Sequence, residues 1–430
     1  MKKDSSVVVR PAQGVAGSLR LPGDKSISHR YAMLAAIAEG TTRLKNFSTG
    51  ADCNSTLGCV QALGADVQRT EDTVVIRGRG PRLQSSDSAL DCGNSGSTMR
   101  MLSGILAGQK FASELTGDES LSRRPMARII TPLGMMGARI TANDGGRPPL
   151  RVNGGELKAI AYSLPVASAQ VKSCLLFAGL FAEGETSVME PVRTRDHGEL
   201  ALRAFGAELT QAGKESRIKG GQALRAIEAE IPGDISSAAF FLCAAALFPD
   251  SYLVIEGLLM NPTRARLLDI LILLGVEISI TQLEELHGEL RGTVKAEGRG
   301  LGTVTIAGAD TAALIDEIPV LAAIAPYTAG GVEIRDAREL RVKESDRIAA
   351  IATNLRAMGA QVEEREDGLK IPGGQRLHGG EADSFGDHRI AMAFAVAALR
   401  AEGETQIRGA DAAVISYPGF FVALESVLQR

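Results

Sequence analysis

Helix-type runs of apolar residues alternate with short strand-type runs along the whole chain. Residues 21–42, "LPGDKSISHRYAMLAAIAEGTT", predict a turn at Pro22-Gly23, a helix capped by Ser26 or Ser28, and a stop at Gly40. Lys25, His29 and Arg30 fall at the start of this helix. The positive end of the helix dipole disfavours cations there. The pattern therefore predicts a negative charge that the local sequence does not supply.

A helix end followed by a glycine and an alternating strand recurs along the sequence. The glycines of this motif are Gly64, Gly137, Gly206, Gly275 and Gly359, spaced by 73, 69, 69 and 84 residues. A second family of helices ends at Gly40, Gly184 and Gly403. We infer six units of about 70 residues, which is too long a repeat for an ordinary solenoid.

The sixth unit is incomplete at the C-terminus. Its helix, near residues 420–428, has no predicted strand after it, so we expect the N-terminal "SVVVRP" strand to complete it. This predicts an α/β protein of two similar three-unit domains, residues 21–235 and residues 1–20 plus 236–430. The two crossings carry the same tripeptide, Pro22-Gly23-Asp24 and Pro232-Gly233-Asp234.

Composition excludes several classes of function. The 430 residues carry a net charge of −4, with 4% aromatic residues and no Trp, which argues against a nucleic-acid partner. The longest apolar run, residues 238–248, is about half a membrane span. The five cysteines form no CxxC pair, as is typical of reduced core thiols. We expect a cytoplasmic protein without a membrane partner, and no metal-binding or P-loop motif is recognisable.

Basic and small polar residues gather at the predicted helix starts. The heads include "GDKSISHR", "GNSGSTMR", "SRRPMAR", "SAQVKS", "RTRDHGE", "VKESDRI" and "GDHRIAM". Free N–H groups, the helix dipole and a cation together favour bound anions. For Arg264 and Arg266 we favour the simpler interpretation of a salt bridge or solvent exposure. The "KESDR" segment is also open to interpretation as a surface cluster with Glu344 paired to Arg347.

Five of these segments, in this order, closely resemble the 5-enolpyruvylshikimate-3-phosphate (EPSP) synthase family. They are "LPGDKSISHR", "GNSGSTMR", "SAQVKS", "RVKESDRI" and "GDHRIAM", and "TRDHGE" resembles its divergent bacterial branch. The resemblance covers nearly the whole chain. It implies two domains of three βαβαββ units, with helix N-termini facing the interdomain cleft. It also implies transfer of the enolpyruvyl group of phosphoenolpyruvate to the 5-hydroxyl of shikimate 3-phosphate, releasing phosphate, without cofactor or metal and in a monomer.

The resemblance assigns roles to individual residues. Shikimate 3-phosphate is expected to contact Lys25, Ser26, Arg30, Ser168, Ala169, Gln170, Arg195, Asp316 and Lys343. Phosphoenolpyruvate is expected to contact Lys25, Gly96, Arg124, Gln170, Arg347, His388 and Arg389. Asp316 is the implied base, Glu344 the implied acid, and Lys25 the third catalytic group. Anionic substrates would supply the negative charge that the first helix requires.

Two positions depart from the better-known members of the family. Ala169 stands where many have a second serine, and Ile415 where many have a lysine. Gly96 is retained, so we expect competitive inhibition by glyphosate, an anion that competes with phosphoenolpyruvate in this family.

Two other functions fit the same motifs. A UDP-N-acetylglucosamine enolpyruvyl transferase is the nearest alternative, but "LTGDESLSRRPMAR" lacks the catalytic Cys of that family's mobile loop. A non-catalytic anion-binding protein is the other alternative. It would have no use for the acid and base at Glu344 and Asp316.

Overall fold

The computed structural model describes residues 5–430. Its contacts divide the chain into two compact units. Unit 2 comprises Gly23–Ile231 and the short segment Glu285–Glu289. Unit 1 comprises the chain up to Pro22 together with Pro232–Glu284 and Leu290–Arg430. The chain therefore leaves unit 1 after Pro22 and returns to it at Pro232.

Unit 2 alternates helices and short strands. Its helices are α1 (Lys25–Ile37), α2 (Ala51–Ala62), α3 (Gly96–Ala107), α4 (Glu119–Ser122), α5 (Ala127–Met135), α6 (Ala169–Gly179) and α7 (His197–Ala204). Its strands are β3 (Ala38–Glu39), β4 (Thr41–Lys45), β5 (Asp66–Arg69), β6 (Thr73–Arg77), β7 (Leu90–Asp91), β8 (Ala112–Thr116), β9 (Arg139–Asn143), β10 (Arg147–Asn153), β11 (Leu157–Lys158), β12 (Ala161–Ser163), β13 (Ala182–Glu183), β14 (Glu185–Met189), β15 (Leu209–Ala212), β16 (Glu215–Lys219), β17 (Leu224–Arg225) and β18 (Glu228–Glu230).

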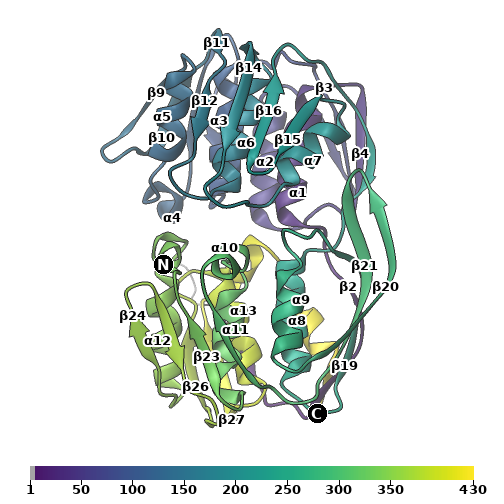
Figure 1. Ribbon diagram of the computed structural model, residues 1–430, viewed down its shortest axis with the longest axis vertical. Helices are drawn as coiled ribbons and strands as arrows, with labels where there is room; N and C mark the ends of the chain where they lie inside the picture. Colours follow the sequence, from purple (N-terminus) through teal and green to yellow (C-terminus); the bar gives the residue numbers. More distant parts are fainter. Residues whose placement is uncertain (1–4) are drawn as a thin grey trace. The chain divides into compact units, whose positions relative to one another are not determined.

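The main sheets of unit 2 repeat one pattern. Their strand orders are β18-β4-β6-β5, β7-β8-β10-β9 and β12-β14-β16-β15. In each, the first pair is parallel and the other pairs are antiparallel. Figure 1 shows the third sheet beside α6 and α7. Because β18 pairs with β4, the last strand of unit 2 completes the sheet of its first repeat.

Unit 1 is built in the same way. Its helices are α8 (Ile235–Ala246), α9 (Arg266–Leu273), α10 (Ala309–Ala313), α11 (Ile318–Ile324), α12 (Arg347–Ala357), α13 (His388–Ala398) and α14 (Phe420–Glu425), with short 3₁₀ turns η1 (Ala325–Tyr327), η2 (Arg338–Val342) and η3 (Ala410–Ile415). Its strands are β1 (Ser6–Val9), β2 (Gly14–Arg20), β19 (Tyr252–Leu259), β20 (Glu277–Leu286), β21 (Glu289–Glu297), β22 (Thr303–Ile306), β23 (Gly331–Ile334), β24 (Glu363–Arg365), β25 (Gly368–Ile371), β26 (His378–Asp383), β27 (Glu402–Arg408) and β28 (Leu428–Gln429).

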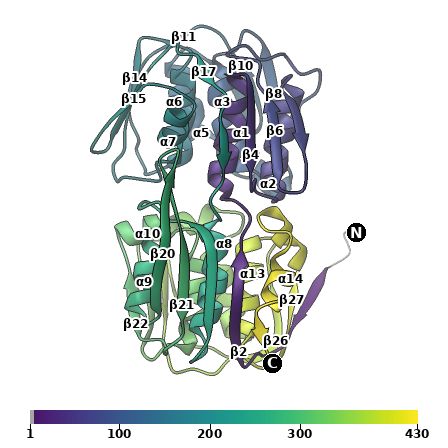
Figure 2. The same ribbon diagram turned by 90° about the vertical axis from the view of Figure 1, so that its right-hand side faces the viewer.

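The N-terminal segment supplies strands to two sheets of unit 1. Strand β1 pairs antiparallel with β27, and β2 pairs parallel with β19. Figure 2 shows the purple N-terminal strand β1 beside the yellow C-terminal elements. One expectation is wrong: α14 is followed by a strand, because β28 pairs with β2. In the sheet of β22, β23, β25 and β24, the parallel and antiparallel pairings match those of unit 2. The two-domain α/β fold of repeated βαβαββ units is confirmed.

The predicted helix-ending glycines have the expected backbone conformation. All five in the first family have positive φ, from 88° at Gly359 to 107° at Gly137, a region that glycine enters without steric cost. The predicted cap of α1 is wrong, however. Asp24, not Ser26 or Ser28, accepts the backbone N–H of Ile27, at 2.9 Å. An ionised Asp at this position also offsets some of the local positive charge.

No helix within residues 5–430 is long and apolar enough to cross a membrane.

Candidate active site

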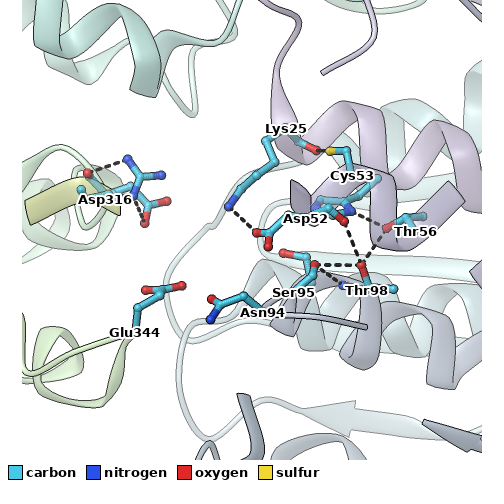
Figure 3. Close-up of polar contacts among 12 residues, drawn as sticks. Lys25, Asp52, Cys53, Thr56, Asn94, Ser95, Thr98, Asp316 and Glu344 are labelled. Atoms are coloured by element: carbon cyan, nitrogen blue, oxygen red, sulfur yellow. Dashed lines mark hydrogen bonds and ion pairs between the residues drawn. The ribbon is translucent and has the colours of Figure 1, made fainter. Parts of the chain in front are cut away.

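The start of α1 in unit 2 holds two of the predicted cations. Lys25 Nζ lies 2.9 Å from Asp52 Oδ2, which comes from the first turn of α2 (Figure 3). Arg30 is buried, and its guanidinium donates to Ser26 O at 2.8 Å and to Ser173 Oγ at 3.1 Å. Burial lowers the pKa of Arg30 to about 10, which still leaves it charged at neutral pH. The start of α1 therefore holds two fixed positive charges.

The start of α6 lies next to Arg30. Ser168 caps this helix by accepting the N–H of Val171 at 3.4 Å, and Ala169 O accepts from Arg30 Nη2 at 3.5 Å. Arg195, which precedes α7, lies close enough to Arg30 to lower the pKa of Arg30. The structure thus brings together the predicted residues of three separate segments. Ala169 takes part through its backbone, so its lack of a hydroxyl does not remove this contact.

The start of α3 gathers the predicted residues Gly96, Arg124 and Gln170. A Cβ added at Gly96 would lie 3.0 Å from Arg100 Nη1 and 3.5 Å from Arg124 Nη1. Arg100 Nη1 donates to Gln170 Oε1 at 2.7 Å, and Gln170 Nε2 donates to Ser97 Oγ at 2.9 Å. Gly96 therefore lies directly against the guanidinium groups of Arg100 and Arg124, which occupy the space beside its Cα that a side chain would need.

Arg124 is held in place by one side chain that precedes α3 and one within α4. Its Nη2 donates to Asn94 Oδ1 at 2.8 Å and to Ser120 Oγ at 3.0 Å. Arg100, Asn94 and Asp52 are contacts that sequence reasoning missed. The Arg in "GNSGSTMR" was visible as a helix-start cation, whereas Asp52 gave no signal because an acidic residue in a first turn is ordinary.

A buried lysine lies behind the start of α6. Lys172 has 0% exposed side chain, and its Nζ lies 2.7 Å from Glu190 and 2.8 Å from Glu199. Ser216 Oγ donates to Glu199 at 3.0 Å. Sequence reasoning also missed this triad, although Lys172 belongs to the "SAQVKS" motif. With its charge balanced inside the unit, Lys172 is a structural group and not a ligand-binding cation.

In unit 1, Arg347 at the start of α12 is the centre of a buried charge cluster. The side chain is 1% exposed, with Nε 2.8 Å from Asp387 Oδ2 and Nη2 2.6 Å from Glu344 Oε2. Burial alone would lower the pKa of Arg347, but Asp387 and Glu344 raise it above its ordinary value. The surface-cluster interpretation of "KESDR" is therefore wrong in its main point. The predicted pair forms, but Arg347 is buried.

The remaining predicted residues of unit 1 surround the same cluster. Asp316 Oδ1 lies 3.7 Å from Arg347 Nη1 and 3.5 Å from Arg389 Nε, and Asp316 O accepts from Arg389 Nη1 at 2.8 Å. His388, the first residue of α13, is buried. Burial lowers the pKa of Lys343, and the nearby Asp316 partly offsets this effect. The carboxylates Asp316 and Glu344 and three basic side chains are thus gathered in unit 1.

Arg264 and Arg266 lie outside these clusters. Arg264 and Arg266 both form salt bridges, with Glu317 at 3.4 Å and with Asp310 at 2.7 Å. Arg264 is buried, so solvent exposure is wrong for it. Across residues 5–430 no group of three or more His, Cys, Asp or Glu side chains is arranged to hold a metal ion.

Comparisons with known proteins agree on one family. Residues 9–424 match the family model described as EPSP synthase (3-phosphoshikimate 1-carboxyvinyltransferase). The chain is 62% identical over 426 residues to the 3-phosphoshikimate 1-carboxyvinyltransferase of Koribacter versatilis, covering 99% of this chain and 100% of that protein. It is 56% identical to the enzyme of the same name from Solibacter usitatus, with 98% and 99% covered. Its structure is similar to EPSP synthase from Acinetobacter baumannii, with a TM-score of 0.88, 41% identity and 99% of each chain covered.

Proposed function

The chain belongs to the EPSP synthase family, and we propose that the residue clusters described above bind its substrates and carry out its chemistry. The enzyme is a 3-phosphoshikimate 1-carboxyvinyltransferase of the shikimate pathway, which leads to the aromatic amino acids. It transfers the enolpyruvyl group of phosphoenolpyruvate to the 5-hydroxyl of shikimate 3-phosphate and releases phosphate. The comparisons support this reaction and not transfer to UDP-N-acetylglucosamine.

The contacts of Arg30 carry the assignment of the shikimate 3-phosphate site. This one guanidinium contacts Ser26 and Ala169, so it joins two segments that the family resemblance assigns to the same substrate. Lys25 and Arg195 add positive charge nearby. We propose that these residues bind the phosphate and carboxylate, and that Ser168 and Gln170 bind the ring hydroxyls. Fixed cations beside helix N-termini are suited to anions.

Phosphoenolpyruvate is proposed to bind the cations around Gly96 and Arg347. The residues proposed to bind it are Lys25, Arg124, Arg347, His388 and Arg389. Gly96 leaves room for a ligand oxygen beside Arg124. Carboxylate and phosphate groups match the planar guanidinium fork, which favours two-point binding.

Acid and base roles are proposed for the two carboxylates beside Arg347. Asp316 lies 3.7 Å from Arg347 and 3.5 Å from Arg389, and its carboxylate is the proposed proton acceptor. It takes the proton from the 5-hydroxyl as that oxygen attacks C2 of phosphoenolpyruvate, and Lys343 orients the same hydroxyl. Glu344 gives a proton to C3, which yields a tetrahedral intermediate. Loss of the C–O bond to phosphate and of a C3 proton then completes the transfer.

Glu344 needs a proton to act as the acid, yet Arg347 lies 2.6 Å away. We propose that phosphoenolpyruvate resolves this conflict. When Arg347 binds the ligand, its charge is shared with an anion, and Glu344 gains a negative neighbour. Both changes raise the proton affinity of Glu344.

Assays of phosphate release test the reaction directly. Phosphate release from phosphoenolpyruvate should require shikimate 3-phosphate and should not occur with UDP-N-acetylglucosamine. Release that did not depend on shikimate 3-phosphate would contradict the proposal. We further propose a cytoplasmic monomer, supported for the compartment by five buried free cysteines, because thiols remain reduced there.

A further inference from the structure

His29 in α1 is a buried basic residue that the proposed function does not use. Its Nδ1 lies 2.7 Å from Thr56 Oγ1 of α2, and Thr56 Oγ1 lies 2.7 Å from Thr98 Oγ1 of α3. Thr98 Oγ1 in turn lies 2.8 Å from Oγ of Ser95, the cap of α3. Figure 3 shows Thr56, Thr98 and Ser95 joined in this way. These four residues, here called the hydroxyl chain, link the second turn of α1 to the first turn of α3 through α2.

The hydrogen-bond geometry fixes the direction of the hydroxyl chain. Ser95 Oγ accepts the backbone N–H of Thr98 at 3.0 Å and also accepts the Thr98 hydroxyl. Thr98 has then used its only proton, so it must accept from Thr56. Thr56 has likewise used its proton and must accept from His29. His29 therefore carries its proton on Nδ1.

The opposite ring nitrogen agrees with this assignment. Nε2 of His29 is buried and has no hydrogen-bond partner among residues 5–430. A bare lone pair in that position costs less than a buried N–H donor without an acceptor. Burial lowers the pKa of His29 well below 6.5, and the nearby charges of Lys25 and Arg30 lower it further. His29 is thus a neutral donor and cannot add to the positive charge around it.

We propose that the hydroxyl chain is a positioning element, in which His29 is the terminal donor that sets the start of α1 against the start of α3. Its importance for catalysis rests on the proposed function. Lys25 lies one turn before His29, and Gly96 follows Ser95 directly. The hydroxyl chain thus links the surroundings of Lys25, which is assigned to both substrates, with those of Gly96, which is assigned to phosphoenolpyruvate alone. Because its members are buried, water cannot replace a lost hydrogen bond.

The first experiment measures the tautomer of His29 and needs no substrate. Nitrogen NMR of histidine-labelled protein resolves five histidines, and His29→Asn assigns the signal of interest. A neutral ring with its proton on Nδ1 at pH 7 is expected. A proton on Nε2, or a protonated ring at this pH, would overturn the direction of the hydroxyl chain and with it the proposal.

The second experiment removes one hydroxyl without changing the side-chain shape. Thr98→Val should raise the KM for phosphoenolpyruvate roughly three- to tenfold, which is the equivalent of one net hydrogen bond. The Kd of shikimate 3-phosphate should stay within about twofold of the native value. Thr98→Ser restores the hydroxyl and should recover the native KM. Thr186→Val is the matched control, because the Thr186 hydroxyl is also buried in unit 2 but has no hydrogen-bond partner among the described residues.

The outcomes separate positioning from stability. Equal weakening of both substrates, or a KM equal to that of the Thr186→Val control, would overturn the positioning role. If Thr98→Val does not fold, His29→Asn, which keeps a donor near Nδ1, should retain the native KM while His29→Leu raises it. If native protein failed to use shikimate 3-phosphate, the proposed function would fail, and the NMR result would still decide the direction of the hydroxyl chain.

Discussion

Gly96→Ala should separate phosphoenolpyruvate binding from stability. The added methyl carbon would lie 3.0 Å from Arg100 Nη1, inside the ordinary contact distance, so the guanidinium must withdraw by about half an ångström. That guanidinium donates to Gln170 at 2.7 Å, and the bond would lengthen or break, at a cost of about 1 kcal/mol. A methyl group that intrudes on a tightly held ligand costs about 1–3 kcal/mol more.

These contributions sum to about 2–4 kcal/mol and predict a roughly thirty- to thousandfold rise in the KM for phosphoenolpyruvate. Stability should stay about level, because the helix propensity gained with alanine offsets the weakened hydrogen bond between Arg100 and Gln170. The inhibition constant of glyphosate should rise at least tenfold, and the Kd of shikimate 3-phosphate should rise much less, because only Gln170 among its proposed contacts is disturbed.

Steady-state phosphate release, calorimetric titration with shikimate 3-phosphate and thermal unfolding together measure these effects. Gly134→Ala is the control, since a methyl at this helical glycine meets no atom within 4 Å. If Gly96→Ala and Gly134→Ala gave the same KM and the same glyphosate inhibition, Gly96 would not line the phosphoenolpyruvate site. Parallel loss of shikimate 3-phosphate binding would instead indicate general disruption of α3.

Other substitutions test the remaining groups. Glu344→Gln should lower kcat about a hundred- to ten-thousandfold, as loss of a proton-transfer group does, with the Kd of shikimate 3-phosphate unchanged in calorimetry; near-native turnover would return Glu344 to a structural role. Arg124→Ala should mainly raise the KM for phosphoenolpyruvate, and a selective loss of shikimate 3-phosphate binding would refute its placement. Burial lowers the pKa of Lys343 from 10.5, so Lys343 should lose its proton at a lower pH than an ordinary lysine does. The KM for shikimate 3-phosphate should begin to rise at that lower pH, and Lys343→Arg should flatten the pH profile of the KM. Lys172→Met leaves two buried carboxylates without their cation and should cost about 3–5 kcal/mol in urea unfolding, whereas Lys110→Met, at a side chain 77% exposed, should cost little.

The repeated architecture could be predicted because it depends on local signals. A glycine after each helix is required by backbone geometry, so its spacing reveals the units without any knowledge of packing. The cap of α1 was predicted incorrectly because Asp24, Ser26 and Ser28 are all good caps by type. Ser28 instead accepts the N–H of Ser48 at 3.1 Å, a contact between segments that no local pattern shows.

Local patterns alone predicted only the cations of the candidate site, and its other residues were assigned through the family resemblance. Lys25, Arg30 and Arg347 were visible because basic residues at helix starts are unfavourable without a partner. Of the groups that hold them, only Glu344 was predicted, as the partner of Arg347. Asp52 looks like an ordinary helix-start acid, and the hydroxyl chain of His29 depends on three helices that are distant in sequence. Burial and partner choice are set by tertiary packing, which a single sequence does not encode locally.

The pairing of the N-terminal strand β1 with β27, far along the chain, has a consequence for synthesis on the ribosome. Strand β1 cannot pair until β27, about 400 residues later, has been translated, since Ser6 lies opposite Arg408. By contrast, all strands of the sheets within residues 23–231 belong to that segment, including β18, which completes the sheet of the first repeat. At a translation rate of about 5–20 residues per second, strand β1 stays unpaired for some tens of seconds. Strand β1 is therefore made long before its partner, and until β27 arrives its apolar "SVVV" segment presents an unpaired strand edge at which misassembly can begin.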